Sequence, residues 1–265
     1  MKKIFISIAL IFVVFLSANA QDSSTLDRIV KKGELRVGMT GNQPPYTMVA
    51  KTGEMIGYEV DLANLLAGYM QVELKLVKMP FGKLLPALES GKIDIIMSGM
   101  SITAKRSTSA LFASPYLFTG KSILLKEYNL EKLNTPEEIN NPEVTLVALK
   151  GSTSEEFVKK LLPEAKLTLA KDYDTAVELI ATGKVKAMIA DIEICQVAIL
   201  QNFGKNLTTL EQPLTIEPVS MALPKNDFTM ESFMSNYFTT LRMVGALQAL
   251  DIKWFEDGSW LSLVE

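Results

Sequence analysis

The sequence predicts an α/β fold of two lobes, each a mostly parallel sheet flanked by helices, joined by two hinge strands. Strand patterns alternate with helix patterns along the chain, which is the order found in βαβ units. A short phrase also recurs, because GKIDIIMS at residues 91–98 is echoed by GKVKAMIA at residues 183–190. Each phrase follows an amphipathic helix pattern, so two lobes of similar design are expected.

The first half predicts a βαβαβ unit. Residues 34–38 form the first expected strand, which ends at the breaker-rich turn TGNQPP. Apolar residues at helical spacing predict a helix over 62–70, and apolar residues that alternate with polar ones predict a strand over 72–76. A second helix over 84–88 ends at a glycine and leads to an apolar strand at 93–97. We therefore expect a parallel sheet.

The second half repeats this order of elements. Its expected strands cover residues 144–148, 167–170 and 187–190. Helical spacing predicts helices over residues 154–162, 173–182 and 192–201. The same kind of sheet is thus expected a second time.

Two stretches between the halves, 122–126 and 213–223, show no helical period and are predicted as the hinge strands. This arrangement makes the first lobe discontinuous. It would contain residues 21–121 and the tail 219–265, which includes an apolar helix pattern. The second lobe would contain residues 122–218.

Residues 1–20 predict a signal peptide for export through the Sec pathway. Lys2 and Lys3 precede an apolar run over residues 4–16, and Ala18-Asn19-Ala20 is a small-residue cleavage pattern. We expect cleavage after Ala20 and a periplasmic location. The run of 13 residues is short for a membrane span, which needs about 20, so we expect no stable membrane anchor.

Composition excludes several kinds of chemistry. The sequence contains no histidine, so it cannot form a His-based catalytic triad or a His-ligated metal site. It has no Gly-rich phosphate loop, and no cofactor or metal is expected. The net charge of −3 becomes −5 when Lys2 and Lys3 leave, which argues against nucleic acid as a partner. The one cysteine, Cys195, lies in an apolar stretch and is expected to be a buried thiol.

Four motifs carry a family resemblance over nearly the whole mature chain. They are SGMSITAKR at 98–106, FASPY at 112–116, GYEVDLA at 57–63 and GST at 151–153. Together they resemble the polar amino-acid-binding proteins of ABC importers, which are bacterial extracellular solute-binding proteins of family 3. The resemblance implies a type II periplasmic-binding-protein fold that closes on an amino-acid-like ligand. It also implies a monomer whose partner is the membrane permease of an importer.

The first motif supplies the expected carboxylate site. Arg106 can hold an α-carboxylate through two parallel charge-assisted hydrogen bonds, which a lysine cannot do with the same geometry. Ser101, five residues earlier, could donate its hydroxyl to the same group. Ser98 and Gly99 are expected in the same binding loop. Without the motif, Arg106 would be interpreted as a solvated surface residue.

The second lobe is expected to complete the site. Ser152 and Thr153 lie between a strand and a helix, where free N–H groups and the helix dipole favour anions, although they could serve only as an N-cap. Asp191 ends the echoed strand and could accept from an α-ammonium or cap the next helix. Phe81 is expected in a loop, where it could pack against a ligand side chain or fill the core.

Thr40 and Gln43 stand where the resemblance expects the residues that set specificity. In binders of basic amino acids, an acidic residue often takes the place of Thr40 and an aromatic one the place of Gln43. Neither is present. A cationic side chain would then lack a counter-charge, which favours a polar or neutral amino acid as ligand.

A second hypothesis is an enzyme. Some proteins of this fold are cyclohexadienyl dehydratases, and Lys121 resembles a lysine that they carry in the same turn. Glu193 could supply a proton. However, it stands two residues after Asp191 instead of three, and one residue turns a helical side chain by about 100 degrees, which could aim it away from the cleft. A receptor sensor or the targeting module of a cell-wall lyase would reuse the fold, but we expect neither.

Overall fold

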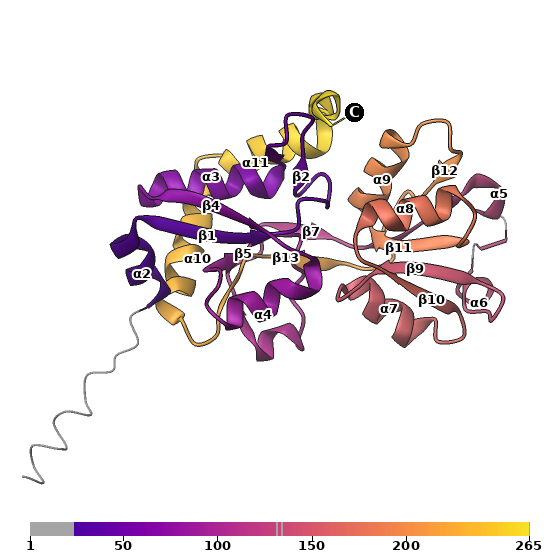
Figure 1. Ribbon diagram of the computed structural model, residues 1–265, viewed down its shortest axis with the longest axis horizontal. Coiled ribbons are helices and arrows are strands. Elements are labelled where there is room, and N and C mark those ends of the chain that lie inside the picture. The colour runs from indigo at the N-terminus through magenta and orange to yellow at the C-terminus, as the bar shows by residue number, and fades with distance from the viewer. Residues whose placement is uncertain (1–23, 131, 134, 265) are drawn as a thin grey trace, which may run out of the picture.

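The computed structural model describes residues 24–130, 132–133 and 135–264. It shows two lobes side by side, each with its own sheet and flanking helices, which confirms the predicted fold class (Figure 1). The signal peptide and its cleavage site lie outside the described residues. Within the described residues, no helix combines the length and hydropathy that crossing a membrane requires.

The first lobe is built on a five-stranded sheet with the order β4-β1-β5-β14-β6. The strands are β1 (Glu34–Met39), β4 (Glu73–Lys78), β5 (Ile95–Ile96), β6 (Ala110–Phe112) and β14 (Ala222–Pro224). Strands β4, β1 and β5 run parallel, whereas β14 is antiparallel to both of its neighbours. Because β14 comes from the end of the chain, this lobe is discontinuous in sequence.

Helices cover both faces of the first sheet. They are α2 (Thr25–Lys32), α3 (Tyr58–Met70), α4 (Leu84–Glu89), α10 (Phe228–Met243) and α11 (Ala246–Asp251). Short 3-10 or π turns occur at Phe81–Lys83, Arg106–Thr108, Ile252–Glu256 and Ser259–Leu263, and β2 (Met48–Val49) pairs with β3 (Met55–Ile56). The tail helix α10 buries Met234, Tyr237 and Phe238 in the same core as β1 and α3.

The second lobe repeats the plan with the sheet order β10-β9-β11-β8-β12. Its strands are β8 (Lys121–Lys126), β9 (Thr145–Leu149), β10 (Lys166–Ala170), β11 (Ala187–Asp191) and β12 (Leu207–Thr208). Its helices are α5 (Glu127–Leu130), α6 (Pro136–Ile139), α7 (Thr153–Leu161), α8 (Tyr173–Ala181) and α9 (Ile192–Gln201). Strands β10, β9 and β11 run parallel, whereas β8 is antiparallel to β11.

The echoed phrases occupy equivalent places in the two sheets. Gly91 follows α4 with φ of +67° and Gly183 follows α8 with φ of +72°, a left-handed conformation that glycine adopts without strain. Each glycine turns the chain into the central strand of its sheet, β5 in one lobe and β11 in the other. The recurrence in sequence therefore reflects a recurrence in structure.

The prediction that 122–126 is a hinge strand was wrong. The first five residues of β8 are buried, and the strand pairs with β11 and β12 inside the second sheet, so Lys121 belongs to the second lobe and not, as predicted, to the first. The crossing strands are β7 (Leu117–Thr119), which lies outside both predicted stretches, and β13 (Glu217–Val219), which lies within the predicted stretch 213–223. They pair antiparallel between the two lobes (Figure 1). A long apolar strand is buried in a sheet core, whereas the link between two lobes can be short and partly exposed.

Gly120 lies where the chain leaves β7 for the second lobe, and it packs against the returning segment. A Cβ added there would lie 1.8 Å from the carbonyl oxygen of Thr215 and 2.7 Å from Cβ of Pro213. Gly68, in α3, has no atom within 4 Å of the same added Cβ. Close backbone contact at the crossing thus requires glycine at position 120.

We expect Gly120→Ala to lower the free energy of unfolding by about 1–3 kcal/mol, as overpacking does in other proteins. Gly68→Ala is the matched control, and it should raise the free energy of unfolding by up to about 1 kcal/mol, because alanine is the better helix former. Urea unfolding followed by circular dichroism measures both. A Gly120→Ala variant as stable as the unaltered protein would contradict the close approach.

Candidate ligand-binding site

The two lobes are in contact across a closed cleft. From the first lobe, Arg106 Nη2 donates to the carbonyl oxygen of Gly151 at 3.3 Å. Tyr46 donates its hydroxyl to Glu193 Oε2 at 3.0 Å, which joins the loop before β2 to the start of α9. Arg106 and Glu193, two of the predicted site residues, therefore lie where the lobes meet.

Arg106 lies inside this cleft. Its side chain is buried, Nη1 donates to the carbonyl oxygen of Ser101 at 2.8 Å, and the guanidinium carbon lies 5.4 Å from the centre of the Phe81 ring. Burial lowers the pKa of the Arg106 guanidinium, although arginine keeps its charge in proteins. Among the described residues, only these two backbone carbonyls accept from the guanidinium, so N–H groups are left for a ligand.

Glu59 positions the loop that precedes Arg106. Its buried carboxylate accepts from the Gly99 N–H with both oxygens at 2.9 Å, and the Tyr116 hydroxyl donates to the same carboxylate. Three motifs of the sequence thus meet at one carboxyl group. Burial raises the pKa of Glu59 to about 7, since the hydrogen bonds from Tyr116 and Gly99 only partly offset the loss of water.

At the start of α7, Ser152 and Thr153 make different contacts. The Ser152 hydroxyl accepts from the Glu155 N–H at 3.2 Å and donates to the carbonyl oxygen of Leu149 at 2.7 Å, so this side chain acts as an N-cap. The Thr153 hydroxyl donates to Glu217 Oε2 at 2.8 Å. The Glu155 N–H is capped by Ser152, and the N–H groups of Thr153 and Ser154 before it have no intrahelical acceptor.

Asp191 ends β11 and makes no side-chain cap to α9. Its Oδ1 is instead in an ion pair with Lys121 Nζ, because Lys121 is its direct cross-strand partner on β8. The Lys121 side chain is 1% exposed, and its Nζ also lies 3.1 Å from Glu217 Oε2. Lys121 therefore lies between two carboxylates, one on the second lobe and one on a hinge strand.

Glu217 is a site residue that the sequence motifs do not identify. It lies on β13 and contacts Lys121 and Thr153. Although burial opposes ionisation, the charge of Lys121 and hydrogen bonds from Thr153, Ser101 and Lys121 hold the pKa of Glu217 below its usual value. The sequence does show a carboxylate in a predicted hinge segment. Whether the Glu217 side chain points into the cleft, however, depends on how β7 and β13 pair, which the sequence does not show.

The specificity positions form a buried network within the first lobe. Gln43 Oε1 accepts from the Thr40 hydroxyl at 2.8 Å and also from the Ser98 hydroxyl, whose oxygen accepts from the Thr40 N–H at 3.1 Å. Thr40 and Phe81 also line a cavity of about 280 Å³ that Leu149 and Asp172 close from the second lobe. No carboxylate of the first lobe lines this cavity among the described residues.

Glu193 points toward the first lobe, so the expectation that its position could aim it away from the cleft was wrong. Its carboxylate accepts from Tyr46 and from the Thr119 hydroxyl on β7. The start of α9 faces the crossing strands, so the first turn reaches the cleft even after the one-residue slip. Burial raises the pKa of Glu193 above its usual value, although hydrogen bonds from Thr119 and Tyr46 oppose this.

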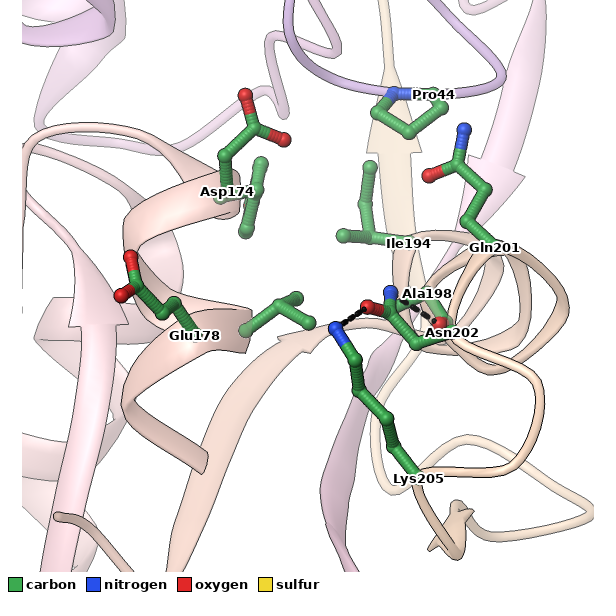
Figure 2. A pocket seen from close by; sticks show the side chains of 10 residues that line it. Pro44, Asp174, Glu178, Ile194, Ala198, Gln201, Asn202 and Lys205 are labelled. Atoms are coloured by element: carbon green, nitrogen blue, oxygen red, sulfur yellow. Dashed lines mark hydrogen bonds between the residues drawn. The ribbon is translucent and has the colours of Figure 1, made fainter. Parts of the chain in front are cut away.

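A second cavity, of about 160 Å³, lies between α8 and α9 (Figure 2). Asp174 and Glu178 border it from α8, while Lys205 donates to Asn202 Oδ1 at 2.6 Å near the end of α9. None of the predicted site residues lines it.

Cys195 is buried, and burial raises the pKa of its thiol to about 12. The described residues contain no group of Cys, Asp and Glu side chains that could hold a metal ion.

Comparison with known proteins gives consistent matches. The sequence pattern of bacterial extracellular solute-binding proteins, family 3, matches residues 35–257. Cyclohexadienyl dehydratase of Pseudomonas aeruginosa is 28% identical over 91% of this chain and 89% of its own length. The L-cystine-binding protein TcyJ of Escherichia coli is 24% identical over 88% of this chain and 87% of its own.

Solved structures show the same similarity. The ancestral amino acid-binding protein AncCDT-1, a precursor of cyclohexadienyl dehydratase, superimposes with a TM-score of 0.83 and 32% identity. The match covers 88% of this chain and 100% of the AncCDT-1 chain. The chain is thus similar both to amino-acid-binding proteins and to a dehydratase, so a binding protein and an enzyme are the two functions to be distinguished.

Glu59 leads to a prediction about pH. Its pKa is higher in the folded protein than in the unfolded chain, so its contribution to stability is complete below about pH 4.5 and is lost as the pH rises through about 7. We expect Glu59→Gln to reduce the fall in unfolding free energy between pH 5 and pH 8. The absence of histidine removes the side chain that would ordinarily titrate there. Urea unfolding at several pH values measures this, and identical pH profiles for the two proteins would contradict it.

Proposed function

Because the chain belongs to the bacterial extracellular solute-binding proteins of family 3, we propose that it binds a small amino acid between its two lobes. It acts in the periplasm as a monomer and delivers the ligand to the membrane permease of an ABC importer. The observation that carries this function is the Arg106 guanidinium, which is buried between the lobes with N–H groups left for an anion.

Arg106 binds the α-carboxylate of the ligand. Its planar fork matches a carboxylate with two parallel hydrogen bonds, and burial strengthens them because little water competes. The first N–H groups of α7, near Thr153, reach the same oxygens from the second lobe, whereas the Ser101 hydroxyl donates to Glu217. One carboxylate is therefore bound by both lobes at once.

Asp191 binds the α-ammonium with Oδ2. Its Oδ1 is paired with Lys121, whereas Oδ2 accepts no hydrogen bond from the part of the chain that the structure describes. The ligand adds these contacts only when the lobes meet, so it favours the closed form over an open one. The permease then binds the closed form of the protein.

The ligand is a polar or neutral amino acid. Thr40 and Gln43 are hydrogen-bonded to each other, and neither offers a negative charge to a cationic side chain. Phe81 forms an apolar wall of the cavity beside Thr40. Asp172 lines the same cavity from the second lobe, but its carboxylate accepts from the Thr175 N–H and lies 3.7 Å from Lys171 Nζ. A short polar or apolar side chain therefore fits this environment without leaving a charge unpaired.

We expect Arg106→Ala to weaken amino-acid binding by 100-fold or more, because loss of one partner of a buried charge pair costs about 3–5 kcal/mol. Arg106→Lys should also weaken binding, since an ammonium cannot make the paired hydrogen bonds. Isothermal titration of the mature protein with each of the twenty amino acids measures both variants.

The matched control is Lys105→Ala, whose side chain is 80% exposed next to Arg106 and should leave affinity within about twofold, as exposed ion pairs contribute little. Affinity in Arg106→Ala equal to that of the unaltered protein would reject the site. Tight arginine binding with no response to neutral amino acids would reject the ligand class.

A cyclohexadienyl dehydratase is the second candidate function. It is favoured by one observation, that Lys121 and Glu193 both lie at the cleft, and by the 28% identity to the Pseudomonas enzyme. Such an enzyme removes the hydroxyl and the ring carboxylate of prephenate as water and carbon dioxide, which leaves phenylpyruvate. Glu193 would protonate the leaving hydroxyl.

We expect no phenylpyruvate when the purified protein is incubated with prephenate, because Glu193 is hydrogen-bonded to Tyr46 and Thr119 and not directed at a substrate. Phenylpyruvate is detected by its absorbance after addition of alkali. The Glu193→Gln variant is the control for slow non-enzymatic decay of prephenate. Formation well above that control would establish the enzyme and contradict the binding protein.

A further inference from the structure

Lys121 is the most deeply buried cation of the described cleft. Its side chain is 1% exposed, and the atoms near Nζ include Asp191 Oδ1 and Glu217 Oε2. An ammonium group this far from water is stable only when counter-charges replace its hydration. Both carboxylates therefore belong to the environment of Lys121.

This arrangement conflicts with a simple reading of Asp191. The proposed function assigns Asp191 to the α-ammonium of the ligand, but Lys121 already occupies Oδ1. A single carboxylate between two buried ammonium groups would leave one positive charge without compensation. A second carboxylate must therefore compensate Lys121 before the ligand can bind.

Glu217 is placed to be that carboxylate. Its Oε2 lies 3.1 Å from Lys121 Nζ and accepts from the Thr153 hydroxyl at 2.8 Å, while Oε1 lies 3.4 Å from the Thr215 hydroxyl. The chain thus holds Glu217 both from the second lobe, through Thr153, and from the segment just before β13, through Thr215. These contacts keep its carboxylate on Lys121 without any contribution from a ligand.

We propose that Glu217 is a positioning residue for ligand binding, which balances the charge of Lys121 so that Asp191 can accept the α-ammonium. The inference rests on the proposed function and extends it to a residue outside the family motifs of the sequence. It also defines the ligand class more closely. Within this cluster, the two cations Arg106 and Lys121 are matched by the two carboxylates Asp191 and Glu217, so a ligand of zero net charge adds no unpaired charge to it.

The experiment compares three variants by isothermal titration with each of the twenty amino acids. Glu217→Gln keeps the shape of the side chain but removes its charge, and we expect affinity to fall tenfold or more. Adding Lys121→Met to Glu217→Gln removes the cation that needs compensation, and we expect affinity to return to within about threefold of the unaltered protein. Glu211→Gln, an exposed exchange of the same kind on the same segment, should change nothing.

Recovery of affinity in the double variant distinguishes a positioning role of Glu217 from direct contact between Glu217 and the ligand. If Glu217 touched the ligand, the double variant would bind as weakly as Glu217→Gln, which would overturn the inference. Unchanged or tighter binding by Glu217→Gln would also overturn it. If circular dichroism shows that Glu217→Gln does not fold, the double variant alone tests the inference, because it buries no unpaired charge at this pair. Affinity within about threefold of the unaltered protein would then support the inference, and weaker binding would overturn it.

A different outcome would reject the proposed function itself. If the unaltered protein binds none of the twenty amino acids, that function is rejected, and the inference falls with it. If the unaltered protein binds and Glu217→Gln matches it, only the role of Glu217 is rejected.

Discussion

Ionised side chains buried between the lobes must be paired, and this requirement governs the whole cleft. Arg106 comes from the first lobe, Lys121 and Asp191 from the second, and Glu217 from a hinge strand. Each is compensated by a group from another segment or is left with donors or acceptors for a ligand. In the function proposed above, closure of the lobes and recognition of a zwitterion are therefore one electrostatic event, since charges that water would solvate in an open cleft need partners in a closed one.

The scaffold supports this arrangement with interactions of ordinary kinds. Cross-strand register in the second sheet sets Lys121 beside Asp191, and pairing of β7 with β13 carries Glu217 to the same place. In the first lobe, the buried carboxylate of Glu59 holds the Gly99 N–H and orders the loop that leads to Arg106. Strand ends, a helix start and a hinge thus bring together residues that are far apart in sequence.

Much of this was predictable from the sequence. Hydrophobic periodicity located the main helices and strands, and the recurring phrase indicated the second sheet, because both reflect local burial. The motif at residues 98–106 predicted Arg106 as a ligand contact, and the end of the echoed strand predicted Asp191. Periodicity could not tell a hinge strand from a sheet strand, since residues 122–126 look extended in either place. Nor could it find Glu217 or the Lys121 pair, because these depend on register between distant strands.

The most direct measurement is a crystal structure of the mature protein with the amino acid that binds most tightly. We predict that the ligand α-carboxylate lies on the Arg106 guanidinium and that its α-ammonium lies on Asp191, with the two lobes closed around the ligand. A ligand bound outside the cleft, or one whose carboxylate and ammonium contact neither side chain, would contradict the central claim.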